Sequence, residues 1–130
     1  MKQEKSNNAK ASSLFPLEIK LSQNKRTLKV TFDDGKSCVL GAELLRIESP
    51  SAEVQGHGGP KLIVRNKADI EINNIELVGN YAIRITFSDK HNSGLYTWDY
   101  LFHLFSNEKK LMQEYYKKLK SWCKIFKDIF

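Results

Sequence analysis

Leu28-Lys-Val-Thr-Phe-Asp-Asp34 and Ile83-Arg-Ile-Thr-Phe-Ser-Asp89 are two stretches of this 130-residue chain with nearly the same sequence. Both carry hydrophobic, basic, hydrophobic, Thr, Phe and acidic residues in the same order. The similarity continues, after a one-residue insertion, between residues 39–45 and 95–101. Each copy is typical of a strand, a polar turn, a second strand and a short helix that begins near an acidic residue. The middle of the chain is therefore predicted to be a duplicated scaffold, and functional residues are expected where the copies differ.

Length and composition indicate one globular domain. The chain is 41% hydrophobic and 28% charged, and its length is enough for a single modest core. No apolar run approaches the roughly 20 residues of a membrane-spanning helix. Residues 1–15 are rich in Lys, Asn and Ser and lack the apolar region of a secretory signal, so we expect a disordered leader. We expect a cytoplasmic protein in which Cys38 and Cys123 are reduced, in preference to a disulfide.

The net charge of +6 is unevenly distributed. Residues 16–105 contain 11 Lys or Arg and 11 Asp or Glu, and the excess of positive charge lies in residues 1–15 and 106–130. Nucleic-acid-binding domains usually gather basic residues on the folded module itself. Specific binding of nucleic acid is therefore not expected.

The pattern of short strands and turns predicts an α+β fold. Leu28, Val30 and Phe32 share one face of a strand, and Asp34-Gly35 is a typical hairpin turn because Gly accepts a positive φ. The return strand is expected at 37–40, a short helix at 42–47, further strands at 18–22, 62–65, 68–77, 81–87 and 95–97, and a second helix at 98–105. Tight turns between neighbouring strands favour antiparallel pairing. We predict one small, mostly antiparallel sheet, built from two pseudo-repeated hairpin-plus-helix units within residues 16–105.

Residues 106–130 are predicted to form a separate, Lys-rich amphipathic helix. Its apolar residues recur at steps of three and four: Leu111, Tyr115, Leu119, Trp122, Phe126 and Ile129. Seven lysines occupy much of the remaining surface. Three interpretations stay open: packing on the protein's own sheet, a homodimer or partner contact, and a helix on an anionic membrane surface.

Several separate blocks resemble the gamma-butyrobetaine hydroxylase-like N-terminal domain family. They are Phe32-Asp-Asp-Gly35, Leu44-Leu-Arg46 followed by Ser49-Pro-Ser-Ala-Glu53, Gly79-Asn-Tyr-Ala82, and His91-Asn-Ser-Gly-Leu-Tyr-Thr-Trp98. The resemblance runs in one colinear order over residues 16–104. In the best-understood members this domain precedes a 2-oxoglutarate-dependent hydroxylase domain and binds a structural zinc ion. Short members that resemble this chain stand alone.

The resemblance also indicates where zinc ligands would lie. Three family cysteines fall on Ser49, Ser51 and Val54, and a family histidine falls on His91. Two hydroxyls and an alkyl group do not replace three thiolates around Zn²⁺. We therefore expect this chain to lack the zinc site and to carry no cofactor.

No catalytic machinery is expected. An iron-dependent oxygenase needs two His and one carboxylate on one face of the metal. None of His57, His91 and His103 is followed two residues later by Asp or Glu. No Ser/His/Asp or Cys/His set follows from the spacing of the residues.

Three function classes remain open. The resemblance implies a non-catalytic binding or adaptor module in iron or iron–sulfur metabolism, because related domains are fused to P-loop carriers that load iron–sulfur clusters. Two distant cysteines do not provide a cluster site, so a protein partner is expected. The alternatives are a metal-binding protein that uses His57, His91 or His103, and a membrane or nucleic-acid contact through the basic helix.

The second copy carries most of the candidate interaction residues. Together with residues of the Ser-Pro loop, they form a predicted recognition patch: Arg46, Glu53, His57, His91, Asn92, Tyr96, Trp98 and Tyr100. Tyr and Trp bury a large area at low entropic cost, which suits such a surface. The alternative is that Tyr96 and Trp98 fill the core.

Overall fold

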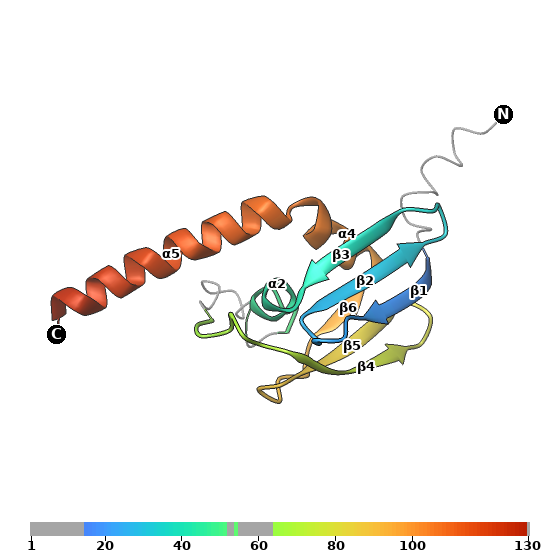
Figure 1. Cartoon of the computed structure of the whole chain (residues 1–130), viewed down its shortest axis with the longest axis horizontal. Coiled ribbons are helices and arrows are strands. Elements are labelled where there is room, and N and C mark those ends of the chain that lie inside the picture. Colours follow the sequence, from blue (N-terminus) through green and yellow to red (C-terminus); the bar gives the residue numbers. More distant parts are fainter. Residues whose placement is uncertain (1–14, 52–53, 55–63, 130) are drawn as a thin grey trace.

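The structure is a computed structural model that describes residues 15–51, 54 and 64–129, with backbone alone for residues 122–129. It contains two three-stranded antiparallel sheets (Figure 1). The first sheet has the order β1 (Pro16–Leu21), β2 (Thr27–Phe32), β3 (Ser37–Gly41), and the second has the order β4 (Ile72–Val78), β5 (Ala82–Phe87), β6 (Leu95–Thr97). Each sheet is followed by a helix, α2 (Ala42–Ile47) or α4 (Trp98–Ser106), and α5 (Glu108–Ile129) ends the described chain.

Local sequence explains the hairpins. The turn between β2 and β3 contains Gly35 at φ +87°, the left-handed conformation that the Asp-Gly pair predicts. Along β2 the side chains of Leu28, Val30 and Phe32 are fully buried, while the residues between them are at least partly exposed. This period of two places one face of the first sheet on the core.

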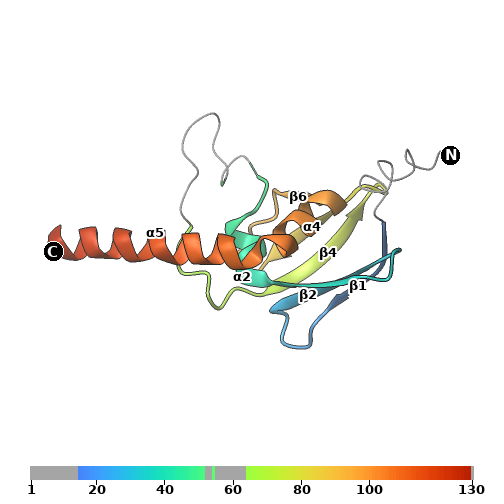
Figure 2. The same ribbon diagram turned by 90° about the horizontal axis from the view of Figure 1, so that it is seen from above.

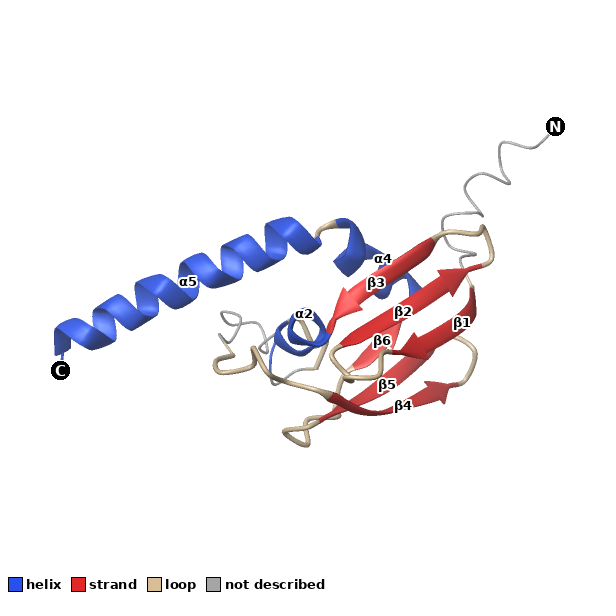
Figure 3. Cartoon of the chain, in the orientation of Figure 1, coloured by secondary structure: helices blue, strands red, loops and turns tan. Residues whose placement is uncertain are grey.

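One hydrophobic core lies between the two sheets and α4. It draws on β2, β3, β4, β5, β6, α2 and α4, and includes Leu28, Phe32, Leu40, Leu45, Ile72, Ile85, Phe87, Tyr96 and Leu101. The sheets are joined by a backbone hydrogen bond from Ile72 N to Lys25 O, at 2.8 Å. The two sheets lie side by side, and α2 lies at one end of their strands (Figure 3). The α+β class is therefore confirmed.

The prediction of a single sheet was wrong, because β1–β2–β3 and β4–β5–β6 form separate ladders. The predicted strand at 68–77 begins only at Ile72, since Ile70 N donates to Lys67 O and the chain turns there. Val64 and Arg65 are not in a strand, and residues 62–63 lie outside the described residues. Both halves contain a three-stranded sheet and a helix, but close similarity of their backbones stays a prediction.

Helix α5 packs on the body through its first turns. Tyr115 is buried with Ile47, Val54 and Val64, and its hydroxyl donates to Val64 O at 2.5 Å. The helix then extends away from the sheets (Figures 1 and 2). The first turns of α5 thus pack on the protein's own domain, against α2, Val54, Val64 and α4, while packing on the sheet, self-association and membrane contact stay predictions. None of the described helices combines the length and apolar character needed to cross a bilayer.

Two other predictions concern the chain ends and the cysteines. Residues 1–14 of the predicted leader lie outside the described residues. Phe15 belongs to the folded body, because its carbonyl accepts from Asp33 N and its ring contacts Trp98 edge to face. Cys38 is a free, buried thiol, and burial raises its pKa.

Candidate functional site

Ser49, Ser51 and His91 converge on one point of the fold, although His91 lies about 40 residues beyond the serines. The serines follow α2, and His91 lies in the connection between β5 and β6. Ser49 Oγ lies 2.9 Å from His91 Nε2 and donates to Ser51 Oγ at 3.2 Å. Ser51 Oγ lies 3.4 Å from the same imidazole nitrogen. We call these three residues the serine–histidine cluster.

Packing around the cluster is tight. Ser49 and Ser51 are both buried, and Gly94 lies against Ser49 and Pro50. A Cβ atom at Gly94 would come within 2.5 Å of Ser49 Oγ and 2.9 Å of Pro50 Cδ. Glycine at position 94 therefore allows the β5–β6 connection to approach the segment after α2.

The residues of the cluster do not fit a zinc ion. The fourth position that the family resemblance indicates, Val54, is buried in an apolar group with Ile47, Val64 and Tyr115. Neutral serine hydroxyls are poor zinc ligands compared with thiolates, imidazole or carboxylates. Within the described residues, no three or more His, Cys, Asp or Glu side chains form a group that could hold a metal ion.

An ion-pair network borders the cluster. Asp89 Oδ2 accepts from Arg46 Nε at 2.8 Å and from Lys67 Nζ at 2.7 Å, and Asp89 Oδ1 accepts from His91 N at 3.1 Å. Burial raises the pKa of the Asp89 carboxyl, but the hydrogen bonds from Lys67, His91 N and Arg46 outweigh it and lower the pKa to about 2. Among the described residues, Arg46 Nη1 is buried without a hydrogen-bond partner.

Two tyrosine hydroxyls hold the C-terminal end of α2. Tyr96 donates to Leu45 O at 2.6 Å, and Tyr100 donates to Glu48 O at 2.5 Å. Burial raises the pKa of Tyr96 strongly and raises that of Tyr100 to about 12. Both hydroxyls are therefore neutral donors at physiological pH, with a structural role.

The structure divides the predicted recognition patch. His91 belongs to the serine–histidine cluster, Arg46, Tyr96 and Tyr100 lie around it, and Asn92 is exposed beside it. Tyr96 is completely buried and Trp98 is nearly so, so the alternative that they fill the core describes them better than a surface patch. Glu53 and His57 lie outside the described residues. His103 is exposed on α4, where it interacts with Asn107.

Trp98 instead borders a second feature, which the sequence did not indicate. An open groove of about 610 Å³ lies between the edge strands β1 and β4, with Trp98 and Asn80 at one end. Its apolar lining includes Leu17, Ile19, Leu21, Ile75, Leu77 and Ile83. We call this the β1–β4 groove.

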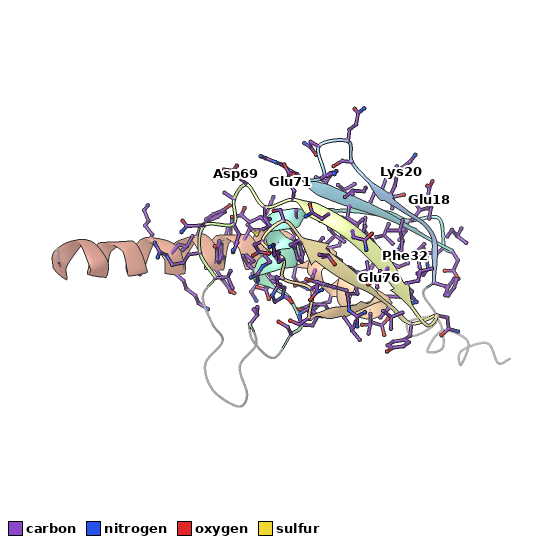
Figure 4. All side chains as sticks on the ribbon, turned by 90° about the horizontal axis from the view of Figure 1, so that it is seen from below. Glu18, Lys20, Phe32, Asp69, Glu71 and Glu76 are labelled. Carbon is purple, nitrogen blue, oxygen red and sulfur yellow. The ribbon has the colours of Figure 1, made fainter. Side chains whose placement is uncertain are left out.

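The β1–β4 groove exposes large apolar side chains. Leu17 is 68% exposed and Leu77 is 70% exposed, whereas the matching faces of β2 and β5 are buried in the core. Figure 4 shows Glu18 and Lys20 on β1 and Glu76 on β4. The sequence analysis did not identify Leu17 as a candidate binding residue. Whether a leucine in a strand is exposed depends on whether the strand lies at the edge of its sheet, and the sequence does not show this.

Comparison with known proteins places the chain in a family. The profile of the family described as gamma-butyrobetaine hydroxylase-like, N-terminal, matches residues 19–102. Two solved NMR structures are 40% and 41% identical, with TM-scores of 0.71 and 0.73, and the matches cover 83% and 84% of this chain and 86% and 82% of those chains.

A crystal structure from Acidithiobacillus ferrooxidans, described as a DUF971-family protein of unknown function, is 37% identical with a TM-score of 0.58. That match covers 68% of this chain and 90% of the other. No curated protein matches the chain. The family profile and these structural relatives agree with the resemblance carried by the sequence blocks, and the chain belongs to the gamma-butyrobetaine hydroxylase-like N-terminal domain family.

Proposed function

We propose that this protein is a non-catalytic binding module that docks an extended segment of a partner protein in the β1–β4 groove. The observation that carries the proposal is the groove itself, where two sheet edges that no other described strand pairs with flank exposed apolar side chains. Contiguous exposed apolar surface of this kind marks interaction sites in soluble proteins. The groove volume of about 610 Å³ lies within the usual range of ligand-binding sites.

The two sheet edges favour an extended occupant. Among the described residues, β1 pairs only with β2, and β4 pairs only with β5. Outer edges of this kind present backbone N–H and C=O groups that an added strand can pair with. Ile19 lies opposite Val30, and Ile75 opposite Ile85, so the groove side of both edges is apolar. A strand with alternating apolar side chains suits both the backbone and the lining.

The serine–histidine cluster supports a non-catalytic role. A serine nucleophile has to reach a substrate carbonyl, and Ser49 is completely buried. The Asp89 carboxylate is bound by Arg46, by Lys67 and by the backbone N–H of His91. Asp89 Oδ1 accepts from the backbone N–H of His91, whereas the acid of a catalytic triad accepts from the imidazole N–H.

The partner that the family resemblance supports is a P-loop carrier of iron–sulfur clusters. Related domains are fused to such carriers, and a stand-alone domain would reach the same carrier by docking. In this proposal the module works in the cytoplasm and holds no cluster itself. The partner contributes the cluster chemistry, and the groove contributes recognition.

The test measures binding to a purified P-loop iron–sulfur carrier from the same organism. Leu17→Glu combined with Leu77→Glu is expected to weaken binding at least tenfold, because two apolar contacts are lost. Both side chains are largely exposed, so circular dichroism and melting temperature should change little. Val39→Glu, on the exposed face of β3, is the matched control and should leave binding unchanged.

The docking site and the identity of the partner are refuted by different results. Binding that the double variant leaves intact would contradict the groove as the docking site. A carrier that shows no binding at micromolar concentrations would contradict the identity of the partner.

A further inference from the structure

We infer that the serine–histidine cluster fastens the segment after α2 to the β5–β6 connection as a hydrogen-bonded junction that works without a metal ion. This inference is independent of the β1–β4 groove. At the position where the family resemblance indicates a structural zinc ion, hydrogen bonds between side chains join the two segments of this chain.

Interatomic distances support direct bonding between the three side chains. Ser49 Oγ, Ser51 Oγ and His91 Nε2 are separated by 2.9 to 3.4 Å, which is hydrogen-bonding range. Ligands at about 2.0–2.3 Å from a tetrahedral zinc ion lie roughly 3.3–3.8 Å from one another. Two of the three separations here are shorter than that. The three side chains therefore hydrogen-bond one another, and a set of two hydroxyls and one imidazole does not suit a zinc ion.

Neighbouring contacts hold both sides of the cluster in place. On the His91 side, the backbone N–H is bound by Asp89, which is itself anchored by Arg46 and Lys67. On the serine side, Tyr100 donates to Glu48 O immediately before Ser49. The junction thus links two segments about 40 residues apart through groups that are already oriented, which reduces the entropy lost in forming it.

Val54, at the fourth position that the resemblance indicates for a zinc ligand, makes apolar contacts instead. It packs with Ile47, Val64 and Tyr115, so an alkyl side chain at this position helps to hold the first turns of α5. Tyr115 also donates to Val64 O. The segment after α2 is therefore held by hydrogen bonds at Ser49 and Ser51 and by apolar contact with α5 at Val54.

The first experiment uses the full wild-type chain produced in zinc-supplemented medium. Elemental analysis is expected to find zinc and iron well below one atom per chain, and EDTA is expected to leave the melting temperature unchanged. One equivalent of zinc that His91→Ala removes, or a melting temperature that falls with EDTA, would overturn the inference.

The second experiment tests whether the junction contributes to stability. Ser49→Ala and His91→Ala are each expected to lower the melting temperature by about 5–10 °C, because a buried polar partner is left unsatisfied. Asn92→Ala, at an exposed neighbouring position, is the matched control and should change it little. Melting temperatures of Ser49→Ala and His91→Ala equal to wild type would overturn the inference.

A third experiment tests whether the positions that the resemblance indicates for zinc ligands lie close together in the fold. Ser49→Cys, Ser51→Cys and Val54→Cys together supply three thiolates beside His91, and this variant is expected to bind about one zinc ion and to become sensitive to EDTA. A folded variant that takes up no zinc would contradict the convergence of Ser49, Ser51 and His91, to which position 54 is tied by the hydrogen bond from Val54 N to Ser51 O.

Discussion

Asp89→Asn removes the charge that holds two cationic side chains next to the serine–histidine cluster. Asp89 Oδ2 binds Arg46 Nε at 2.8 Å and Lys67 Nζ at 2.7 Å. Asparagine keeps an oxygen that can accept from His91 N, so the shape of the turn should survive. The Arg46 side chain, which is only 11% exposed, then loses its counter-ion.

The expected loss of stability is about 2 kcal/mol. The pKa of Asp89 falls from 3.8 to about 2 on folding, which corresponds to about 2.5 kcal/mol of stabilisation of the ionised carboxylate. Because the Asp89 side chain is 21% exposed, solvent screening leaves about 1 kcal/mol of this. Burying Arg46 without a counter-ion adds about 1 kcal/mol. A chain of this size should lose roughly 6–10 °C in melting temperature.

Urea unfolding and calorimetry at pH 7 measure the effect. The control is Asp69→Asn, whose ion pair with Arg26 spans 3.5 Å and whose side chain is 90% exposed; its expected cost is below about 0.5 kcal/mol.

The pH dependence of the Asp89 effect follows from its lowered pKa. Because the folded pKa lies below the unfolded one, the stabilisation is complete above about pH 4 and disappears as the pH falls towards 2. An Asp89→Asn variant as stable as wild type at pH 7 would refute the reasoning. A difference between the two proteins that stays constant from pH 7 to pH 2 would refute it too.

Two further substitutions test the packing around the cluster. Tyr96→Phe leaves the buried Leu45 carbonyl without its donor and should cost about 1–3 kcal/mol in urea unfolding; a loss below 0.5 kcal/mol would contradict the importance of this hydrogen bond. Gly94→Ala places a methyl group 2.5 Å from Ser49 Oγ and should cost about 1–3 kcal/mol. Gly41→Ala, where a Cβ meets no atom within 4 Å and φ is an ordinary −76°, should cost less than about 1 kcal/mol, and equal losses at the two glycines would refute the steric explanation.

Local patterns were enough to predict most of the hairpins and helices. The period of two in β2 and β5 and the Asp-Gly turn act over neighbouring residues, so the sequence displays them directly. The division into two sheets was not predictable in this way. It depends on the path of the chain between α2 and β4, where Lys67–Ile70 turn and Asn66 adopts φ +60°. Neither feature has a strong sequence signal.

The candidate site was predicted only in part. The family resemblance indicated Ser49, Ser51 and His91 as equivalent positions, and the structure brings them together. Tyr96 and Trp98 were ambiguous, because aromatic residues suit both a core and a recognition surface. The β1–β4 groove could not be predicted, since it requires knowing which strands are edges and that Leu17 and Leu77 lie on opposite walls.

The shared core has a consequence for how this protein folds. Each ladder forms between strands that are close in sequence, so hairpin formation costs little loop-closure entropy and should be fast. Neither half can bury Phe32 or Phe87 by itself, however, because their common core needs both sheets. The hairpins should therefore gain lasting stability only on docking, and chains cut between α2 and β4 should refold as a pair and remain largely unfolded when kept apart.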